Sequence, residues 1–585
     1  MNKIIPGFWY LENNNLYNKS KTKKYELLST KFYDLKNNTK NWREAEKIYN
    51  QILLELSYNL NRIHLLNWKP SSWEIIIGPW LKKYLAVVTN RVFLIKNKNN
   101  LKKKFFFRNF KKNNNLNSRD INDFISKVIN DNWNEEIFKR LENYFDSKKN
   151  KLSILENKVI YENSNSNKIV IFLKFIVSYV LKIYNFIFSR NSTFVFSRPY
   201  FGKKIYFLKL LFKLREFPII YILDDEKQNF WFDKNLRNKL TFNNSKNLNE
   251  KIAKSLLPEC LPRIYLEGFN IIQNKIKKSN LPKKKKIIFT SNLRNDSIFK
   301  FWLGFQKQKG AKIILAQHGG GYNMFNYDES LSYELKVCDR YLTWGWNNQK
   351  NKKIIPFSIL NQNIQQDTSA SYKKGFSVGM NNFDQYVYSN DPPTILNLID
   401  SEKNLDYREL NALKIFLNGL NQDIKNKIVI RPHPSKLRKH TTKKFEQDFN
   451  KKFKFNRNYR ISGEKFLENF QLNIFTQLQS TTTIFSLAKN FPSLIICPHD
   501  LKYFNIETKK IILLLKKANI FHSSPKNAYK FLNKIYKDPN RWWKQKKTQA
   551  ARIEFCNMHG KCSNKQFLTK LTNVLLKEKK NFIRI

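Results

Sequence analysis

The chain has 585 residues, which is enough for two to four domains and a large hydrophobic core. Hydrophobic residues make up 41% of it and aromatic residues 15%, a composition that excludes an intrinsically disordered protein. The formal net charge is +61, from 107 Lys+Arg against 46 Asp+Glu, which suits nucleic acid, an anionic membrane surface or a phosphate-bearing ligand. The lysines are spread over the whole length beside many Asn and Ile, as in a general compositional bias, so charge alone selects none of these partners.

The cysteines and the N-terminus indicate the compartment. The cysteines are scattered without a CxxC pair, so we expect neither a zinc motif nor a disulfide framework, and a reducing cytoplasm fits best. The first residues lack the long apolar core of a signal peptide. The cysteines are Cys260, Cys338, Cys497, Cys556 and Cys562.

Residues 24–150 are predicted to be mostly helical. Residues 43–64 carry apolar side chains at three- and four-residue steps, the pattern of an amphipathic helix. An apolar segment follows at 73–81, where Gly78-Pro79 predicts a break with another helix behind it. The stretch 96–117, rich in lysine and asparagine, is predicted to be a surface loop.

Residues 168–188 form the one membrane-like stretch of the sequence. Lys174 and Lys182 interrupt it, so we do not expect a clean membrane span. Two structures remain open for this stretch. One is a buried helix or pair of strands, and the other is an interfacial helix whose lysines snorkel to the membrane surface.

From about residue 168 the pattern becomes an alternation of strands and helices. This β–α–β order, with loops at the strand ends, predicts a doubly wound parallel sheet. The polar stretch 347–372 is predicted to be an interdomain linker. The predicted strands are 193–197, 217–223, 286–291, 311–316 and a short final one within 338–346, with a loop at 198–202 and a helix from near Asp296 to Gly310.

A second alternation follows the linker. The apolar run 428–430 reads as a buried strand that proline cuts off. After Asp538 the chain is predicted to be helical again. The other predicted elements are strands at 375–380, 472–475 and 493–497, a short extended segment at 460–462, and a helix at 407–420.

The predicted fold class is therefore α/β. It has two Rossmann-like doubly wound domains facing a cleft, a helical N-terminal region and a closing C-terminal helix, an outline that resembles a GT-B glycosyltransferase. The expected boundaries are 1–165 for a mainly helical N-terminal region of the first domain, 166–346 for the first Rossmann-like, acceptor-side domain, 347–372 for the linker, 373–540 for the second Rossmann-like, donor-nucleotide domain, and 541–585 for C-terminal helices.

A glycine-rich loop, Gln317-His-Gly-Gly-Gly-Tyr322, follows the strand at 311–316. The three glycines Gly319, Gly320 and Gly321 allow close backbone approach, as a loop that lines a substrate needs. His318 has a side chain able to act as a base near neutral pH, and the chain has seven histidines in all. A tight turn with an incidental histidine is the alternative.

A run of hydroxyls, Ser480-Thr-Thr-Thr483, lies between a strand and an apolar helix. Such residues cap a helix N-terminus, but capping needs one hydroxyl and not four. The same position offers free backbone N–H groups and the positive end of the helix dipole, which together suit a phosphate. We therefore interpret Ser480, Thr481 and Thr482 as phosphate-binding residues.

Arg431 and His433 lie at the carboxyl end of the strand at 428–430. Open α/β sheets place their ligands at this edge, so both side chains are candidates for the same phosphate, with Arg431 supplying charge-assisted hydrogen bonds. A strand followed by a polar turn is the alternative.

Several common motifs are missing. The sequence has neither GxGxxG nor GxxxxGK[ST], so we expect neither NAD binding nor a P-loop, and no carboxylate cluster has metal-ligand spacing. We therefore expect no cofactor and no metal. Glu334 and Asp339 are carboxylates close to the glycine loop, and Asp339 is interpreted as a structural group at the start of its strand.

Taken together, these motifs resemble the bacterial leptospiral-type family of surface-carbohydrate transferases, over nearly the whole chain. The resemblance implies a transferase of surface glycans. Residues 11–24 and 375–388 match the family poorly. The matching segments are Ile63-His64, 73–81, 198–200, 317–322, 339–346, 431–434, 480–482, Trp542-Trp543, 549–552 and Phe555-Cys556.

A wider resemblance implies a mechanism. His433-Pro434 paired with Ser480–Thr482 is similar to the HP and serine-rich motifs of bacterial sialyltransferases, capsule Kdo transferases and glycerophosphotransferases. There the pair grips the phosphate of a CMP- or CDP-activated donor. By that analogy His433 and Ser480–Thr482 would bind the phosphate, and His318 would face them as the catalytic base or acceptor-binding group.

The leading hypothesis is thus a cytoplasmic, metal-independent GT-B transferase that uses a nucleotide-sugar donor and a glycan or lipid-linked acceptor, with peripheral contact to the inner face of the plasma membrane. One alternative is a non-catalytic membrane-surface component of glycan assembly. The other is a basic nucleic-acid-binding protein, against which stand the even spread of lysines and the lack of a known binding module.

Overall fold

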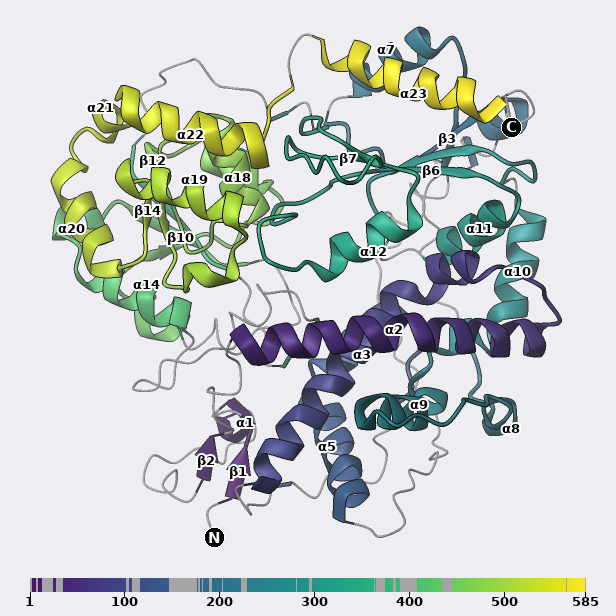
Figure 1. The fold of residues 1–585 in the computed structure, drawn as a ribbon. Coiled ribbons are helices and arrows are strands. Elements are labelled where there is room, and N and C mark those ends of the chain that lie inside the picture. Colours follow the sequence, from purple (N-terminus) through teal and green to yellow (C-terminus); the bar gives the residue numbers. More distant parts are fainter. Residues whose placement is uncertain are drawn as a thin grey trace.

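The computed structural model describes most of the chain. The described residues are 3–6, 9–12, 25–27, 35–100, 105–107, 116–146, 176, 179–180, 183–188, 192–202, 204–221, 229–279, 281–293, 297–361, 363–364, 374–381, 386–389, 408–433, 445–563 and 566–583. They form two six-stranded parallel sheets, each covered by helices, a two-stranded sheet, and a helical body that packs on the helices of the first six-stranded sheet (Figure 1). The predicted α/β class is confirmed.

The first sheet has six parallel strands in the order β4-β3-β5-β6-β7-β8. Successive residues of its strands alternate between two apolar cores, so helices cover both faces, as the continuous apolar runs require. The strands are β3 (Phe194–Ser197), β4 (Ile219–Tyr221), β5 (Ile287–Thr290), β6 (Lys312–Ala316), β7 (Arg340–Leu342) and β8 (Ile354–Ile355). Its helices include α7 (Lys204–Leu214), α11 (Ser297–Gln308) and α12 (Glu329–Val337).

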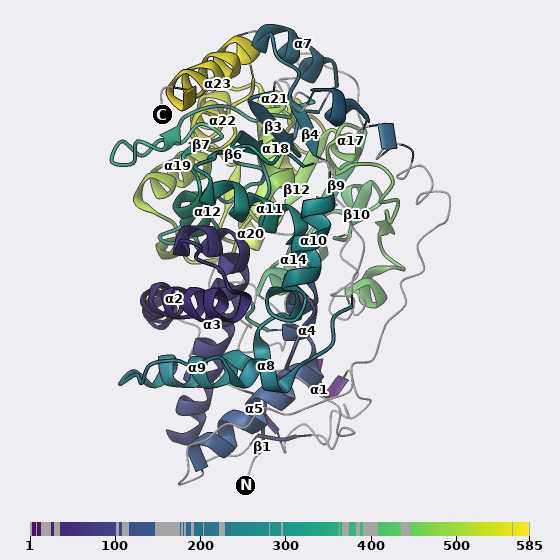
Figure 2. The same cartoon turned by 90° about the vertical axis from the view of Figure 1, so that its right-hand side faces the viewer.

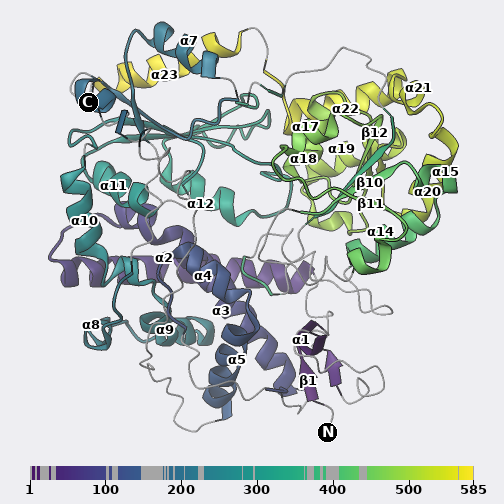
Figure 3. The ribbon, with the colours of Figure 1, turned by 180° about the vertical axis from the view of Figure 1, so that it is seen from behind.

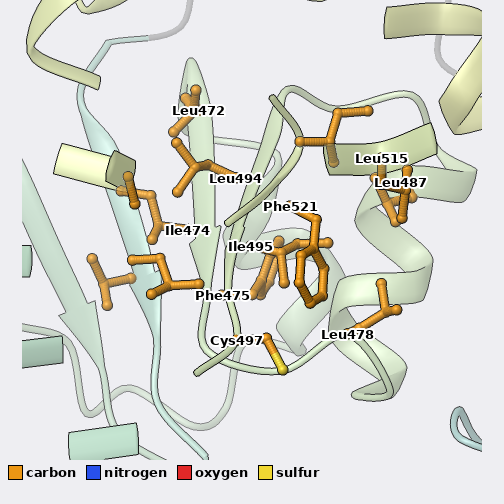
Figure 4. Close-up of a cluster of buried hydrophobic side chains, with 14 of the residues drawn as sticks. Leu472, Ile474, Phe475, Leu478, Leu487, Leu494, Ile495, Cys497, Leu515 and Phe521 are labelled. Atoms are coloured by element: carbon orange, nitrogen blue, oxygen red, sulfur yellow. The ribbon is translucent and has the colours of Figure 1, made fainter. Parts of the chain in front are cut away.

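The second sheet also has six parallel strands, in the order β11-β10-β9-β12-β13-β14. In chain order this is 3-2-1-4-5-6, the dinucleotide-binding order, and the order reverses between β9 and β12. Figure 4 shows side chains from β12 and β13 meeting helix residues such as Leu487 and Leu515 in its core. The strands are β9 (Phe376–Gly379), β10 (Ile428–Arg431), β11 (Lys454–Phe455), β12 (Leu472–Phe475), β13 (Ser493–Ile496) and β14 (Phe521–His522).

Short helices surround the second sheet. They are α14 (Arg408–Asn418), α15 (Gln422–Lys425), α17 (Gly463–Leu467), α18 (Thr481–Ala488), η5 (Leu501–Tyr503), α19 (Ile506–Lys517), α20 (Pro525–Ile535), α21 (Pro539–Trp543) and α22 (Lys546–His559). We call each six-stranded sheet with its covering helices a lobe. The last helix, α23 (Phe567–Ile583), follows the second lobe in the chain and packs Leu571 and Leu575 against the first sheet beside α7 (Figures 1 and 2). The closing C-terminal helix thus connects the two lobes.

The helical body is built from two separate stretches of chain. Its apolar core joins α2 and α3 to α9 and η3, which follow β4 in the sequence (Figure 3). Its elements are β1 (Lys3–Ile5), α1 (Trp9–Glu12), β2 (Tyr25–Leu27), α2 (Leu35–His64), α3 (Pro70–Asn100), α4 (Ile121–Val128), α5 (Asp131–Asp146), α8 (Lys234–Asn238), α9 (Leu248–Cys260), η3 (Arg263–Tyr265) and α10 (Phe269–Lys278).

The predicted break at Gly78-Pro79 is wrong, because α3 runs through it. A helical proline cannot donate to the carbonyl four residues earlier, here that of Ile75. The hydroxyl of Tyr333 on α12 donates to that carbonyl instead, at 3.0 Å. Gly78 makes room for the same ring, since a Cβ there would lie 2.8 Å from Tyr333 Cε2.

Other predictions fail at the ends and edges of elements. Residues 96–100 continue α3 and are not part of a loop, and Leu116 is buried. The strand within 338–346 is not the last of its sheet, because β8 pairs beside it from inside the predicted linker. The edge strand beside β10 is β11, which the sequence did not predict, and the segment 460–462, predicted to be short and extended, begins in a turn.

The stretch 168–188 is helical where the structure describes it, at residues 176, 179–180 and 183–188, and residues 168–175 lie outside the described part. Several of its large apolar side chains are exposed, so burial is not supported for these residues. None of the helices in the described part of the chain has the length and apolar content of a membrane span.

The contact at Pro79 gives a stability prediction. Tyr333→Phe should lower the free energy of unfolding by about 1–2 kcal/mol, because the buried Ile75 carbonyl loses its donor. In a Pro79→Ala background the alanine N–H can bond that carbonyl, so the same substitution should cost less. Urea unfolding of the wild type, both single variants and the double variant measures the coupling between Tyr333 and Pro79. An equal loss of stability from Tyr333→Phe in both backgrounds would contradict the proposed role of its hydroxyl.

Candidate functional site

The buried side chain of Gln317 holds the glycine loop in place through hydrogen bonds. Its Oε1 accepts hydrogen bonds from Trp344 N at 3.0 Å and Trp346 Nε1 at 2.8 Å, and its Nε2 donates to Gly319 O at 2.8 Å. Trp344 Nε1 also donates to the Gln317 carbonyl. Both the oxygen and the nitrogen of the Gln317 amide are therefore bonded inside the first lobe, where they fix the loop.

The loop meets the N-terminus of α18 in the other lobe. Gly320 N donates to Thr481 Oγ1 at 2.9 Å. A Cβ on Gly320 would lie 2.4 Å from the carbonyl oxygen of Gln479 and 3.0 Å from Thr481 N. Gly321 has φ +87°, a conformation that favours glycine. The residues of the predicted loop and of the predicted hydroxyl run are thus brought into direct contact, each at the carboxyl end of a strand.

Most of the hydroxyl run is not used for capping. Ser480 is the N-cap of α18 but makes no side-chain capping bond, and Thr481 accepts from the other lobe. Only Thr483, which is buried, bonds within its own lobe, donating to Gln477 O at 2.8 Å. The first intrahelical bond runs from Ile484 N to Ser480 O, so the backbone N–H groups of the preceding turn remain available for an anion.

Gln479 is a site residue that the sequence did not predict. It is 6% exposed, and its amide nitrogen and oxygen are both buried without a hydrogen-bond partner. Its side chain lies under Gly321, with Cβ and Cγ within 3.9 Å of where that residue's Cβ would be. Buried polar atoms without partners are rare, and at a loop contact they indicate a place for a bound polar group. Its only signal in the sequence is its position before the hydroxyls.

His318 is connected to a buried carboxylate through Tyr322. The Tyr322 hydroxyl donates to Glu334 Oε1 at 3.0 Å and lies 3.5 Å from His318 Nδ1. Tyr341 donates to the other oxygen, Glu334 Oε2, at 2.8 Å, and burial followed by this carboxylate raises the pKa of Tyr341. With the Tyr322 proton on Glu334, the Tyr322 oxygen is placed to accept a hydrogen bond from Nδ1–H of His318.

Asp339 has the structural role expected of it. It forms an ion pair with Lys307 at 2.9 Å and accepts from the backbone N–H of Ile313 at 2.8 Å.

Arg431 lies at the end of β10 and turns toward α17. One guanidinium nitrogen donates to Ile461 O at 2.6 Å, and the group lies 4.6 Å from the ring centroid of Phe466. Its Nη1 is buried without a hydrogen-bond partner. Desolvation lowers the pKa of Arg431 from its usual value. His433 is exposed two residues farther on, at the same edge of the sheet, and its place beside the hydroxyl run stays a prediction.

A strained loop from the first lobe also reaches the second. Arg198 and Tyr200, just after β3, have φ of +45° and +61°, values that are uncommon outside glycine and that cluster at functional sites. Tyr200 packs against the core of the second lobe. Burial and the nearby carboxylate of Glu464 raise the pKa of Tyr200 to about 12. The sequence marked this loop as a motif but not as part of the site.

Behind the hydroxyl run, a buried network joins the strand ends of the second sheet. Glu409 lies at the start of α14. Its carboxylate accepts hydrogen bonds from Gln477 Nε2 at 2.7 Å and from Asn381 Nδ2 at 3.1 Å, and it lies 2.6 Å from His499 Nε2. Asn381 also donates to Thr476 Oγ1 at 2.7 Å. These residues follow β9, β12 and β13, so one carboxylate fixes the loops at the point where the strand order reverses. The sequence did not predict this network, because its members are far apart in the chain.

Comparison with known families decides what kind of protein this is. Residues 1–575 match the sequence profile of the family described as LIC12162 family transferase. The chain belongs to the LIC12162 family of transferases. No curated protein matches this transferase significantly.

Three solved structures show low similarity to this LIC12162 family transferase. A complex of S. aureus MnaA with UDP is 11% identical, covering 67% of this chain and 98% of that one, with a TM-score of 0.35. Apo OtsA is 8% identical, covering 66% and 99%, with a TM-score of 0.32. WaaG, a glycosyltransferase of lipopolysaccharide biosynthesis, is 11% identical, covering 65% and 99%, with a TM-score of 0.26.

The glycine loop gives a matched pair of test substitutions. In this LIC12162 family transferase, Gly320→Ala should lower the free energy of unfolding by about 1–3 kcal/mol, because its Cβ would meet backbone atoms of the other lobe. Gly319→Ala should change it by less than about 0.5 kcal/mol, since that Cβ would lie 3.4 Å from the nearest atom, Thr481 Oγ1. Urea unfolding measures both, and equal effects would argue against the lobe contact.

Proposed function

We propose that this transferase is a glycosyltransferase that uses a nucleotide-activated donor, CMP- or CDP-linked, to build surface polysaccharide or lipopolysaccharide. The acceptor is a glycan or a lipid-linked glycan, and a related sugar- or polyol-phosphate transfer would use the same site. The observation that carries the proposal is the contact between Gly320 and Thr481, which joins the carboxyl-end loops of the two sheets. In this assignment 166–346 is the acceptor-side domain and 373–540 the donor-side domain.

The donor phosphate is proposed to bind at the start of α18. Ser480 and Thr482 offer hydroxyls, the first turn offers backbone N–H groups, and the Gln479 amide beside them is buried without a partner. His433 would approach the phosphate from the end of β10. Arg431 would add positive charge, and it also holds the chain at Ile461. Groups of this kind stabilise the negative charge that develops on a departing nucleotide.

His318 is proposed as the base on the acceptor side. An acceptor hydroxyl attacks the anomeric carbon of the donor sugar, the bond from that carbon to the donor phosphate oxygen breaks, and the nucleotide leaves with the bonding electrons. The hydroxyl proton passes to His318 Nε2. Tyr322 supports this role because it accepts from Nδ1–H while it donates to Glu334.

A thermal-shift panel of CMP-, CDP-, UDP- and GDP-sugars tests the donor class, because a ligand that binds the native state raises its melting temperature. The proposal expects stabilisation by cytidine nucleotides and its loss in His433→Ala. Stabilisation by UDP- or GDP-sugars alone would overturn the donor class, and unchanged binding in His433→Ala would remove that residue from the site.

Two serines at helix N-termini of the second lobe allow nucleotide binding to be tested separately from helix capping. Ser480→Ala should weaken binding of the nucleotide found in the panel by about tenfold, because a hydrogen bond to a charged group is lost, while free-protein stability stays within about 0.5 kcal/mol. Ser524→Ala should do the reverse. Ser524 caps α20, so its loss costs about 1 kcal/mol of stability and no affinity. Calorimetric titration measures the nucleotide affinity of each variant, and thermal unfolding measures its stability. Lost affinity in Ser524→Ala with unchanged affinity in Ser480→Ala would contradict the phosphate assignment.

Two tyrosines on the same carboxylate test the relay to His318. Tyr322→Phe should lower kcat roughly tenfold with little change in KM, because Nδ1 loses its acceptor and Nε2 becomes less basic. Tyr341→Phe removes the other hydroxyl from Glu334 without touching His318, and should leave kcat nearly unchanged. Steady-state kinetics with the donor from the panel measure both, and equal losses would show that Tyr322 acts only through the buried structure.

A further inference from the structure

An apolar helix face points to solvent at the outer end of the first lobe. Within the described residues of the stretch 176–188, large apolar side chains recur at three- and four-residue spacing and are 43–70% exposed. That spacing places them on one side of a helix, which in a soluble domain normally faces the core. They are Ile176, Tyr179, Val180, Ile183, Phe186 and Ile187.

The other side of this helix is attached to the first sheet, so the orientation is fixed. Asn185 pairs with the free edge of β4, accepting from Ile220 N at 3.0 Å and donating to Ile220 O at 2.8 Å. Tyr184 donates to Pro218 O at 3.0 Å, and the ring of Phe188 stacks on that of Phe217 at 4.6 Å. The apolar face therefore points outward because the polar contacts hold it there.

Helix α7 carries a second exposed apolar stripe. Ile205, Leu208 and Phe212 lie on one stripe of α7 and are exposed, Phe212 by 81%, whereas Leu210 and Leu214 on its other side are buried. Phe217, three residues beyond the end of α7, is also exposed, and its ring stacks on Phe188 on the attached side of the other helix. Figure 2 shows α7 and α23 at the end of the molecule away from α5 and α9.

Among the described residues of α7 and of the segment just after it, the exposed charged groups are basic. Lys209, Lys213 and Arg215 are exposed on α7 and just after it. The neighbouring Glu216 is only partly exposed, and its carboxylate already binds Lys579 at 2.5 Å and the backbone N–H groups of Thr193 and Phe194. An apolar face bordered by basic residues fits an anionic bilayer. A second copy of this chain fits poorly, because each copy carries a formal charge of +61.

We propose that this face docks on an anionic lipid bilayer. Phe186, Ile187 and Phe212 insert into the boundary between headgroups and acyl chains, and Lys209, Lys213 and Arg215 contact lipid phosphates. The proposal does not depend on the donor chemistry. It would place the enzyme where a lipid-linked acceptor is found.

Co-sedimentation of the full chain with vesicles tests the proposal. Wild-type protein should bind vesicles of phosphatidylcholine mixed with phosphatidylglycerol, and bind phosphatidylcholine alone much more weakly. Phe186→Ser/Phe212→Ser should reduce binding to the anionic vesicles on the order of 100-fold, because two large apolar side chains are lost from the contact. Leu513→Ser/Ile553→Ser, which removes exposed apolar residues of α19 and α22 in the other lobe, should leave binding unchanged.

Three results would overturn the proposal. They are no binding to anionic vesicles, equal loss in both double variants, and sedimentation-velocity data in which wild-type protein dimerises and Phe186→Ser/Phe212→Ser does not. Matching thermal midpoints of the two variants show that both are folded. Donor-induced thermal shifts should be the same in Phe186→Ser/Phe212→Ser as in the wild type, so a failure of the membrane proposal is distinguishable from a failure of the glycosyltransferase proposal.

Discussion

The structure depends on one close backbone contact between its two lobes. Gly320 lies against Gln479 and Thr481 so closely that a Cβ has no room, and its N–H donates to the threonine hydroxyl. Parallel strands end at the same edge of a sheet, and here the loops at the carboxyl edges of the two sheets face each other. Only a glycine-rich loop allows that approach. On the other side, the first turn of α18, a helix that follows a strand of the second sheet, is suited to an anion.

Each side of this contact is held by a buried polar side chain. Gln317 fixes the glycine loop through two tryptophans, and Glu409 fixes the ends of three strands in the second sheet. Buried hydrogen bonds of this kind make a site rigid, because breaking one leaves a buried polar group that water does not reach. Such rigidity is what a catalytic site needs, since hydroxyls and N–H groups must be placed before a charged ligand arrives.

The proposed site and the proposed membrane face are connected through one segment. The strained loop at Arg198–Tyr200, which packs on the second lobe, leads directly into α7, whose outer stripe is apolar and bordered by lysines. Contact of α7 with a bilayer would therefore act close to the loop that joins the lobes. As composition alone, the large positive charge indicated no partner. On α7, basic residues lie beside exposed apolar side chains, and that combination suits an anionic membrane.

The sequence by itself determined the elements whose physics is local. Continuous apolar runs gave most strands of both sheets, and three successive glycines and four successive hydroxyls marked the two loops that meet. Short edge strands such as β8, β11 and β14 escaped prediction, because their few residues are stabilised by the neighbouring strand and not by their own pattern. Pro79 was misread for a related reason, since the donor that replaces its missing N–H comes from Tyr333, more than two hundred residues away. Only the tertiary structure could show that Gln479 is buried without partners, that Arg431 binds Ile461, and that the large apolar side chains among the described residues of 176–188 are exposed. Burial and hydrogen-bond partners are set by residues distant in sequence, and no local pattern contains them.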